Sequence, residues 1–345
     1  AIIITVIASR MLAGPVTEKG SCGSSFLFGG GKHMGKPFKT YDELVDKLEK
    51  EKGLSVPNRA HLIELLKKYS YYDLISGYKE PFKDKTGNYI AGTTIDDIYA
   101  LYVFDSNLRS IMLGAILTVE KKMKSLLSYA FTECYGDSQQ AYLHPGSYKA
   151  TSTDQAKRIK RLIKILVDIV TPPFDHAYIR HQWEKHGNVP LWVAVKAMTL
   201  GNVSQMYSLL PDRIQAHVSK EFPCVTEGAL ANMLSYLTFI RNVSAHNERL
   251  YDFGANQSKS IPDMPIHSAL KIGKKGKMYK YGKSDLFAAI VCLKYLLPKA
   301  RFERLVVDID REIEILLRKT HRVQKSYLFN RMGFPVAWKD ILRYD

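Results

Sequence analysis

Hydrophobic residues recur every three to four positions along most of the chain, and no stretch before residue 260 alternates like a strand. This spacing predicts amphipathic helices that bury one face. The strongest pattern, residues 95–134, predicts one long helix of about 60 Å with a kink or break near Gly114. Shorter helices are predicted at residues 40–52, 58–70, 154–170, 211–222, 230–252, 286–296 and 299–317, and a helical hairpin with Gly201 at its turn is predicted at residues 190–210. The pattern therefore predicts an all-α fold.

One insertion interrupts the helices. Between residues 254 and 281, Gly and Pro break the periodic pattern and Lys residues accumulate. We expect an exposed basic loop or a short hairpin around residues 273–276. Lys274, Lys275 and Lys277 are candidate contacts for RNA phosphates in either case.

The helix predicted at residues 230–252 changes character halfway along. Its first half carries the apolar stripe Leu230, Leu234, Leu237 and Phe239/Ile240. Arg241, Asn242 and His246 follow, three side chains that can bind phosphate or transfer protons. At about 100° per residue Asn242 and His246 share a face, whereas Arg241 and His246 lie roughly 140° apart. A second copy of the helix, facing the first, would bring Arg and His together better than one copy can.

The pattern Arg-Asn-x-x-x-His formed by these three residues resembles the motif of HEPN ribonucleases, in the form carried by Abi-like (abortive infection) proteins of bacteria. Further similar blocks occur in the expected order at residues 62–82, 101–109, 119–124, 190–207 and 332–338. Another Arg/His pair, Arg180 and His186, has one more intervening residue and no apolar helix leading into it. We therefore do not assign it to the site.

The resemblance implies a HEPN-like helical bundle with additional N-terminal helices and a metal-independent endoribonuclease activity. It also implies a homodimer in which two motif helices build one cleft, a toxin role in defence against phage, and restraint by a regulatory RNA. We expect an N-terminal helical region at residues 34–94 and the HEPN-like domain with a C-terminal extension at residues 95–345.

The chemistry of these groups fits RNA cleavage, because RNA carries its own nucleophile in the 2′-OH. His246 can act as base or acid, and Arg241 can neutralise charge on the phosphate. Asn242 can orient His246 or the phosphate. Glu120 is either a polar partner that supports this site from a neighbouring helix, or part of a solvated charge cluster. Asp105 and Arg109, four residues apart, are expected to form a simple helix-face ion pair.

Charge favours an anionic partner. Lys and Arg number 50 against 34 Asp and Glu, which gives a net charge of +16. No apolar run approaches 18 residues, so we predict no membrane span and favour nucleic acid as the partner. The best candidate for contacting an RNA backbone is the predicted helix at residues 154–170, although its basic residues could equally be a solvated face. These residues are Lys157, Arg158, Lys160, Arg161 and Lys164.

Cysteine and histidine usage shows no metal-binding pattern, so no metal or other cofactor is predicted. Four scattered cysteines are typical of free thiols in a cytoplasmic protein. Residues 1–33 are expected to be a translated leader or a disordered tail, with Met34 as the native start. Two alternatives to the nuclease remain open. One is a non-catalytic protein that holds a structured RNA, and the other is an acceptor of AMP on Tyr251.

Overall fold

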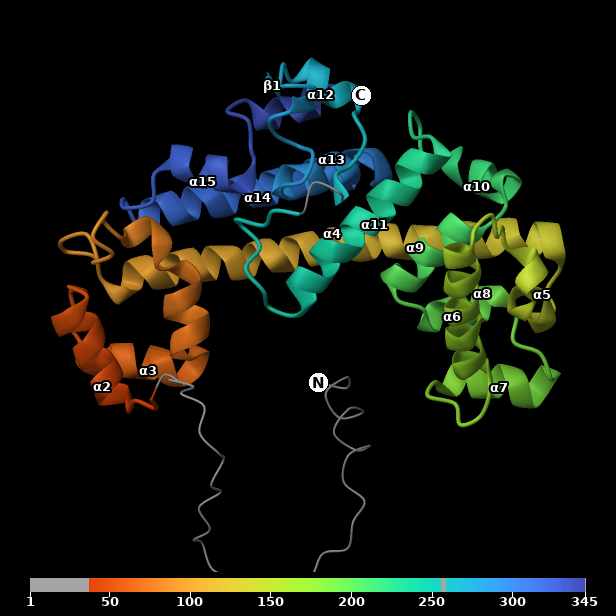
Figure 1. Cartoon of the computed structure of the whole chain (residues 1–345), viewed down its shortest axis with the longest axis horizontal. Coiled ribbons are helices and arrows are strands. Elements are labelled where there is room, and N and C mark those ends of the chain that lie inside the picture. The colour runs from red at the N-terminus through yellow and green to blue at the C-terminus, as the bar shows by residue number, and fades with distance from the viewer. Residues whose placement is uncertain (1–36, 256–258, 345) are drawn as a thin grey trace, which may run out of the picture. The chain divides into compact units, whose positions relative to one another are not determined.

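The computed structural model describes residues 37–255 and 259–344. The chain divides into two units, Ala1–Thr40 and Tyr41–Asp345. Of the first unit only residues 37–40 are described, without helix or strand, and the predicted leader at residues 1–33 lies outside the described residues. In the second unit nearly all regular structure is helical, which confirms the predicted all-α class (Figure 1).

The helices vary widely in length. The N-terminal part contains α2 (Tyr41–Asp46), the π-helical turn η1 (Lys47–Glu51), α3 (Arg59–Tyr69), the π-helical turn η2 (Tyr72–Ser76) and the 3₁₀ turn η3 (Glu80–Phe82). The middle part contains α4 (Ile95–Tyr135), α5 (Gln139–Leu143), η4 (Pro145–Ser147), α6 (Thr153–Val170), α7 (Ala177–His186), α8 (Leu191–Ala194), η5 (Val195–Ala197), α9 (Leu200–Leu209), α10 (Asp212–Ser219) and α11 (Glu227–Ala245). The C-terminal part contains α12 (Pro265–Ala269), α13 (Leu286–Leu296), α14 (Lys299–Lys319), α15 (Lys325–Met332) and η7 (Trp338–Arg343).

Helix α4 is the element on which α10, α11 and α14 pack. A capping box starts it, in which the Asp97 carboxylate accepts the backbone N–H of Thr94 at 2.9 Å. It runs for 41 residues through Gly114, so the predicted break is wrong. Helices α10, α11 and α14 contact α4 along its length (Figure 1). These contacts outweigh the small helix penalty of one glycine, about 1 kcal/mol.

By length and composition alone, α4 is long and apolar enough to cross a membrane. Its most apolar 18-residue window has a mean hydropathy of 1.2, and 44% of that window is buried. The expectation that no segment could span a bilayer is therefore not confirmed on these two criteria. The same properties characterise the central helix of a helical bundle, which is the position that α4 occupies against α11 and α14.

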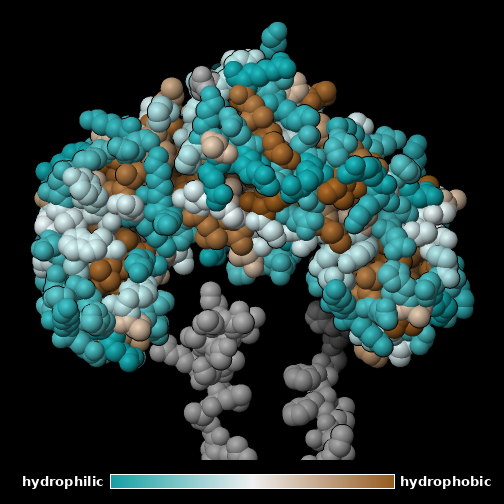
Figure 2. Space-filling view, turned by 180° about the vertical axis from the view of Figure 1, so that it is seen from behind, coloured by the Kyte–Doolittle hydropathy of each residue, from teal (hydrophilic) through white to brown (hydrophobic). Residues whose placement is uncertain are grey.

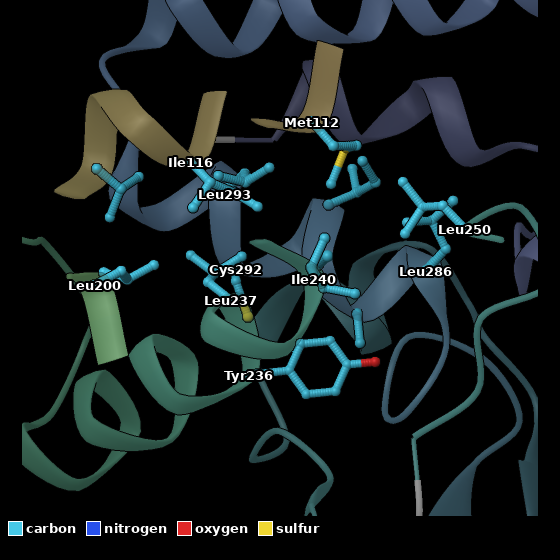
Figure 3. Packing of buried hydrophobic residues seen from close by; sticks show 14 of the residues in the cluster. Met112, Ile116, Leu200, Tyr236, Leu237, Ile240, Leu250, Leu286, Cys292 and Leu293 are labelled. Atoms are coloured by element: carbon cyan, nitrogen blue, oxygen red, sulfur yellow. The ribbon is translucent and has the colours of Figure 1, made fainter. Parts of the chain in front are cut away.

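The core around α11 joins three helices. Figure 3 shows residues of α4, α11 and α13 gathered into one cluster, with Leu250 beside them. The labelled residues from these helices include Met112, Ile116, Tyr236, Leu237, Ile240, Leu286, Cys292 and Leu293. The Tyr236 hydroxyl donates to the backbone oxygen of Asp285 at 2.7 Å, which ties α11 to the start of α13. The predicted apolar stripe of α11 is confirmed, since Leu230, Leu234 and Leu237 are all buried.

The basic insertion forms the hairpin, one of the two expected alternatives. Strands β1 (Lys274–Lys275) and β2 (Met278–Tyr279) pair antiparallel, and Lys274 lies opposite Tyr279. Gly276 in the turn has a φ of 62°, a left-handed conformation that glycine adopts without strain. Lys274, Lys275 and Lys277 are exposed on it. On the face drawn in Figure 2, hydrophilic side chains predominate and hydrophobic ones reach the surface in separate patches.

Candidate functional site at the end of helix α11

Helix α11 ends inside the Arg-Asn-x-x-x-His motif. Its last residue is Ala245, and His246 is the C-cap. Asn247 adopts a left-handed conformation with a φ of 58°, and the N–H of Glu248 donates to the Val243 oxygen at 3.0 Å. This is the bonding pattern of a Schellman C-cap. The prediction of one helical stretch over residues 230–252 is therefore wrong after residue 245, and the turn places His246 where the helix meets the following loop.

The three motif residues differ in exposure. Asn242 and His246 are exposed, whereas Arg241 is half-buried. The backbone N–H of His246 donates to the Asn242 oxygen at 2.9 Å, so these two residues are one turn apart on α11. One copy of the chain thus presents Asn242 and His246 to solvent together and turns Arg241 partly inward.

Arg241 carries a charge that has no acidic partner within the described part of the chain. Its Nε is buried and makes no hydrogen bond there. A buried guanidinium N–H without an acceptor costs stability unless a ligand supplies one. A guanidinium without an acidic partner is a candidate group for binding an anion such as a phosphate.

A buried polar network holds the loop that follows His246. Asp105 of α4 is fully buried, and its carboxylate accepts the backbone N–H groups of Leu250 at 3.1 Å and Tyr251 at 2.6 Å. The Tyr78 hydroxyl donates to the same carboxylate at 2.7 Å. Arg109 forms an ion pair with Asp105, and it donates to the backbone oxygen of Glu248 at 3.4 Å. Tyr78, which precedes α4, and Asp105 and Arg109, which lie on α4, therefore fix the position of this loop together.

The electrostatics of this network follow from its burial. Burial and the neighbouring Asp105 carboxylate raise the pKa of Tyr78 above its usual value, so its hydroxyl stays protonated and donates. Burial also raises the pKa of the Asp105 carboxyl, while Arg109 and the hydrogen bonds oppose that shift. The spacing of Asp105 and Arg109 along the sequence predicts only a helix-face ion pair. The pair exists, but it is buried and acts as an anchor for the loop.

A groove opens beside His246. Its volume is about 1000 Å³. One wall comes from the end of α3 and from η2, and the other comes from the loop after α11. The lining residues are Lys67, Lys68, Tyr69, Ser70, Tyr72, Asp73, Ser76, Gly77, Tyr78, Tyr102, His246, Asn247, Glu248, Arg249, Asp252 and Phe253. The residues of the wall formed by α3 and η2 are not predictable from the sequence, because only the fold brings them close to the motif.

Glu120 lies elsewhere on α4. Its Oε1 pairs with Lys124 at 2.7 Å, and its Oε2 is buried and has no partner among the described residues. It lines a hollow with Trp192 and Lys196. Within the described part of the chain Glu120 makes no hydrogen bond or ion pair with Arg241, Asn242 or His246. The structure thus gives no contact through which it could support them.

The basic residues predicted on α6 line up along its solvent side. Lys157, Lys160, Arg161 and Lys164 are exposed. Arg158 is half-buried, and its Nη2 donates to Ser208 Oγ at 2.9 Å. None of the five forms an ion pair in residues 37–255 or 259–344. Arg158 and Arg161 also line a pocket of about 540 Å³ between α6, α9 and α11, together with Asn232, Ser235 and Phe239 of α11.

Two other expectations concern metal ions and Tyr251. Among the described residues, no group of three or more His, Cys, Asp or Glu is placed to hold a metal ion. Tyr251 is completely buried. Its hydroxyl is therefore inaccessible to a modifying enzyme in this structure, which argues against the interpretation of Tyr251 as an AMP acceptor.

The sequence is similar to a known protein family. The model of the family described as Abi-like protein matches residues 64–252, more than half of the 345 residues. The match spans most of the N-terminal wall of the groove, Asp105 and the Arg-Asn-x-x-x-His motif. No curated protein and no solved structure matches the chain. The extent of the family match shows that the chain belongs to the Abi-like protein family.

Proposed function

We propose that this protein is a cytoplasmic endoribonuclease of the HEPN type that acts as a toxin in abortive infection, the role from which its family takes its name. The observation that carries the proposal is the end of α11. There an exposed His246 opens onto a groove, and Arg241 holds a cationic group with no acidic partner in the described residues.

Cleavage would use the 2′-OH of the substrate. One His246 accepts the 2′-OH proton while the 2′ oxygen attacks the adjacent phosphorus, and Arg241 neutralises the charge that develops on the phosphate. The bond to the 5′ oxygen breaks, and that oxygen takes a proton from an acid. The products are a 2′,3′-cyclic phosphate and a 5′-OH. No step of this scheme requires a metal ion.

The differing exposure of Arg241 and His246 favours a composite site. Asn242 and His246 face solvent from one side of α11, while Arg241 is half-buried. In a homodimer with facing α11 helices, two His246 side chains could act as base and acid. The exposed basic residues of α6 and of the hairpin would bind the RNA backbone away from the cut.

The test uses the purified protein after extraction of bound nucleic acid. Wild type and His246→Ala are incubated with total cellular RNA in EDTA, and the fragment ends are mapped. Cleavage by wild type alone, leaving cyclic phosphate and 5′-OH ends, is expected. The double variant Arg180→Ala/His186→Ala is a matched control, because both residues lie exposed on α7, and it should cut like wild type. Equal cleavage by His246→Ala and wild type would refute the proposal.

A second candidate function is a non-catalytic RNA-binding role. The basic face of α6, without ion pairs in the described residues, is the observation in its favour. This role is distinguished from the nuclease by the following result. A discrete RNA species co-purifies with both wild type and His246→Ala, and neither protein cuts RNA.

A further inference from the structure

The groove beside His246 contains an exposed aromatic side chain that is not part of the Arg-Asn-x-x-x-His motif. Tyr72, on the π-helical turn η2, is 78% exposed. An aromatic ring of this size left in water forgoes the burial that stabilises most aromatic side chains. Since Tyr72 lines the same groove as His246, its ring is available to a ligand bound there.

Charged residues of both signs flank Tyr72: the acidic ones are Asp73, Glu248 and Asp252, and two lysines lie on the wall formed by α3. Lys67 and Lys68, at the end of α3, are both exposed and line the groove, and neither forms an ion pair within the described residues. Lys68 Nζ lies 5.0 Å from the centre of the Tyr69 ring. Aromatic rings interleaved with lysines are the usual means of binding single-stranded nucleic acid, since rings stack on bases and lysines contact phosphates.

The two walls of the groove are tied to each other. Arg249, in the loop after His246, donates to the backbone oxygen of Gly77 and pairs with Asp252 at 2.6 Å. Tyr78, in the N-terminal wall, donates to Asp105, which in turn holds Leu250 and Tyr251. A groove fixed in this way loses little conformational entropy when a ligand enters it.

We propose that this groove binds one unpaired nucleotide of the RNA, with its base stacked on Tyr72 and its phosphate near Lys67 and Lys68. The inference rests on the proposed nuclease function, since it places this nucleotide beside the bond that His246 would cut. A paired base inside a duplex offers no free face to Tyr72. The substrate is therefore RNA that is single-stranded at the cleavage site, and Tyr72 is a residue that determines this specificity.

The test measures binding separately from cleavage. In the His246→Ala background, a short fluorescent single-stranded RNA is titrated with protein, and its anisotropy gives the Kd. Tyr72→Ala is expected to weaken binding about 5- to 150-fold, the range of one base-stacking contact. Tyr72→Phe keeps the ring and should bind within about twofold of its parent. Tyr129→Ala is the matched control, because Tyr129 is 63% exposed on α4 and lines a different pocket.

A cross-link locates the nucleotide. An RNA that contains one 4-thiouridine is irradiated with the protein, and the expected modified peptide contains Tyr72. Unchanged affinity in Tyr72→Ala, or cross-links only to α6 or the hairpin, would overturn the inference. A Tyr72→Ala variant that changes its oligomeric state but keeps its affinity for RNA would also overturn the inference. Tyr72 would then lie in an interface between two copies of the chain.

The experiments distinguish a failure of the nucleotide site from a failure of the proposed nuclease function. If wild type cuts RNA and Tyr72→Ala cuts it with the same KM and kcat, the nuclease stands and the nucleotide site is refuted. If wild type does not cut RNA, but binding depends on Tyr72 and the cross-link forms, the nucleotide site stands and the nuclease is refuted.

Discussion

Asp105 Oδ1 accepts the backbone N–H of Tyr251 at 2.6 Å, across 146 positions of the chain. This bond fixes the loop that begins at His246 to the N-terminal third of α4. The side chain at residue 105 is consequently part of the support for the candidate site, although it contacts none of the three motif residues through a hydrogen bond or ion pair in the described structure.

Asp105→Ala should lower the free energy of unfolding by about 3–5 kcal/mol, because it leaves the buried Arg109 charge without its partner. It also removes the acceptor of two backbone N–H groups, so RNA cleavage should fall as the loop loses its position. Urea denaturation gives the first effect. Glu314→Ala is the control, since it breaks the exposed pair with Lys325 and should cost about 1 kcal/mol or less. Similar losses in both variants would contradict the anchoring role.

Asn247 is expected to tolerate Gly but not Val. Its φ of 58° lies in the left-handed region, which glycine adopts freely and a β-branched residue adopts at a cost of about 1–2 kcal/mol or more. Asn247→Val should therefore unfold at lower denaturant concentration and cut RNA more slowly, because the turn that places His246 is strained. Asn247→Gly should match wild type in both measurements. A neutral Asn247→Val would show that the turn does not depend on this conformation.

Glu120→Gln should leave RNA cleavage within about twofold of wild type, since the only ion pair that Glu120 makes in the described residues is with Lys124. Initial rates measured beside His246→Ala give the comparison. A loss of activity near that of His246→Ala, with unchanged stability, would instead restore Glu120 as a functional partner of the motif.

The basic residues of α6 should set the salt dependence of RNA binding. Replacing Lys157, Lys160 and Lys164 with Ala should reduce the slope of log K against log salt by about 0.7 for each RNA phosphate that the variant no longer neutralises. Arg158 is kept, because it bonds Ser208 and supports the fold. Arg318→Ala/Lys319→Ala removes exposed charge from the end of α14 and serves as the control. Equal slopes in the two variants would remove α6 from the RNA-binding surface.

The raised pKa of the buried Asp285 carboxyl predicts that the stability of the fold depends on pH. Burial raises the pKa of its carboxyl from 3.8 to about 7. Between these values the folded state keeps a proton that the unfolded state releases, so stability falls as pH rises, by about 4 kcal/mol in total. Asp285→Asn should abolish this part of the dependence and keep an acceptor for the N–H of Ala288. Urea titrations of both proteins at about pH 5 and about pH 8 give the difference. Parallel profiles would exclude the assignment.

The helices are predictable because their apolar stripes are regular, and α11 buries the face that the stripe predicts. The break near Gly114 is predicted from the length of the pattern and the presence of a glycine, whereas α4 is continuous there because neighbouring helices pack on it. The end of α11 at Ala245 cannot be predicted from the apolar pattern. It depends on the left-handed conformation of Asn247, which asparagine adopts at some positions only.

The role of Asp105 leaves a signal in the sequence. Residues 101, 105, 108 and 112 follow one helical stripe, and the apolar members of that stripe are buried. A carboxylate in such a stripe has to find buried partners. Which partners it finds could not be predicted, because Tyr78 and residues 250–251 reach it only through long-range contacts. For the same reason the N-terminal wall of the groove could not be predicted.

The bond between Arg249 and Gly77 has a consequence for how members of this family can diverge. The segment before α4 provides Tyr72 and most of one wall of the groove. Under the proposed function, changes in this segment would alter the choice of RNA without altering the motif that cuts it. Grafting residues 41–94 from a related chain should transfer that relative's choice of RNA while His246 stays in place. Deleting the same residues would remove both the wall of the groove and the Tyr78 hydroxyl that donates to Asp105, so the loop after His246 would lose part of its support.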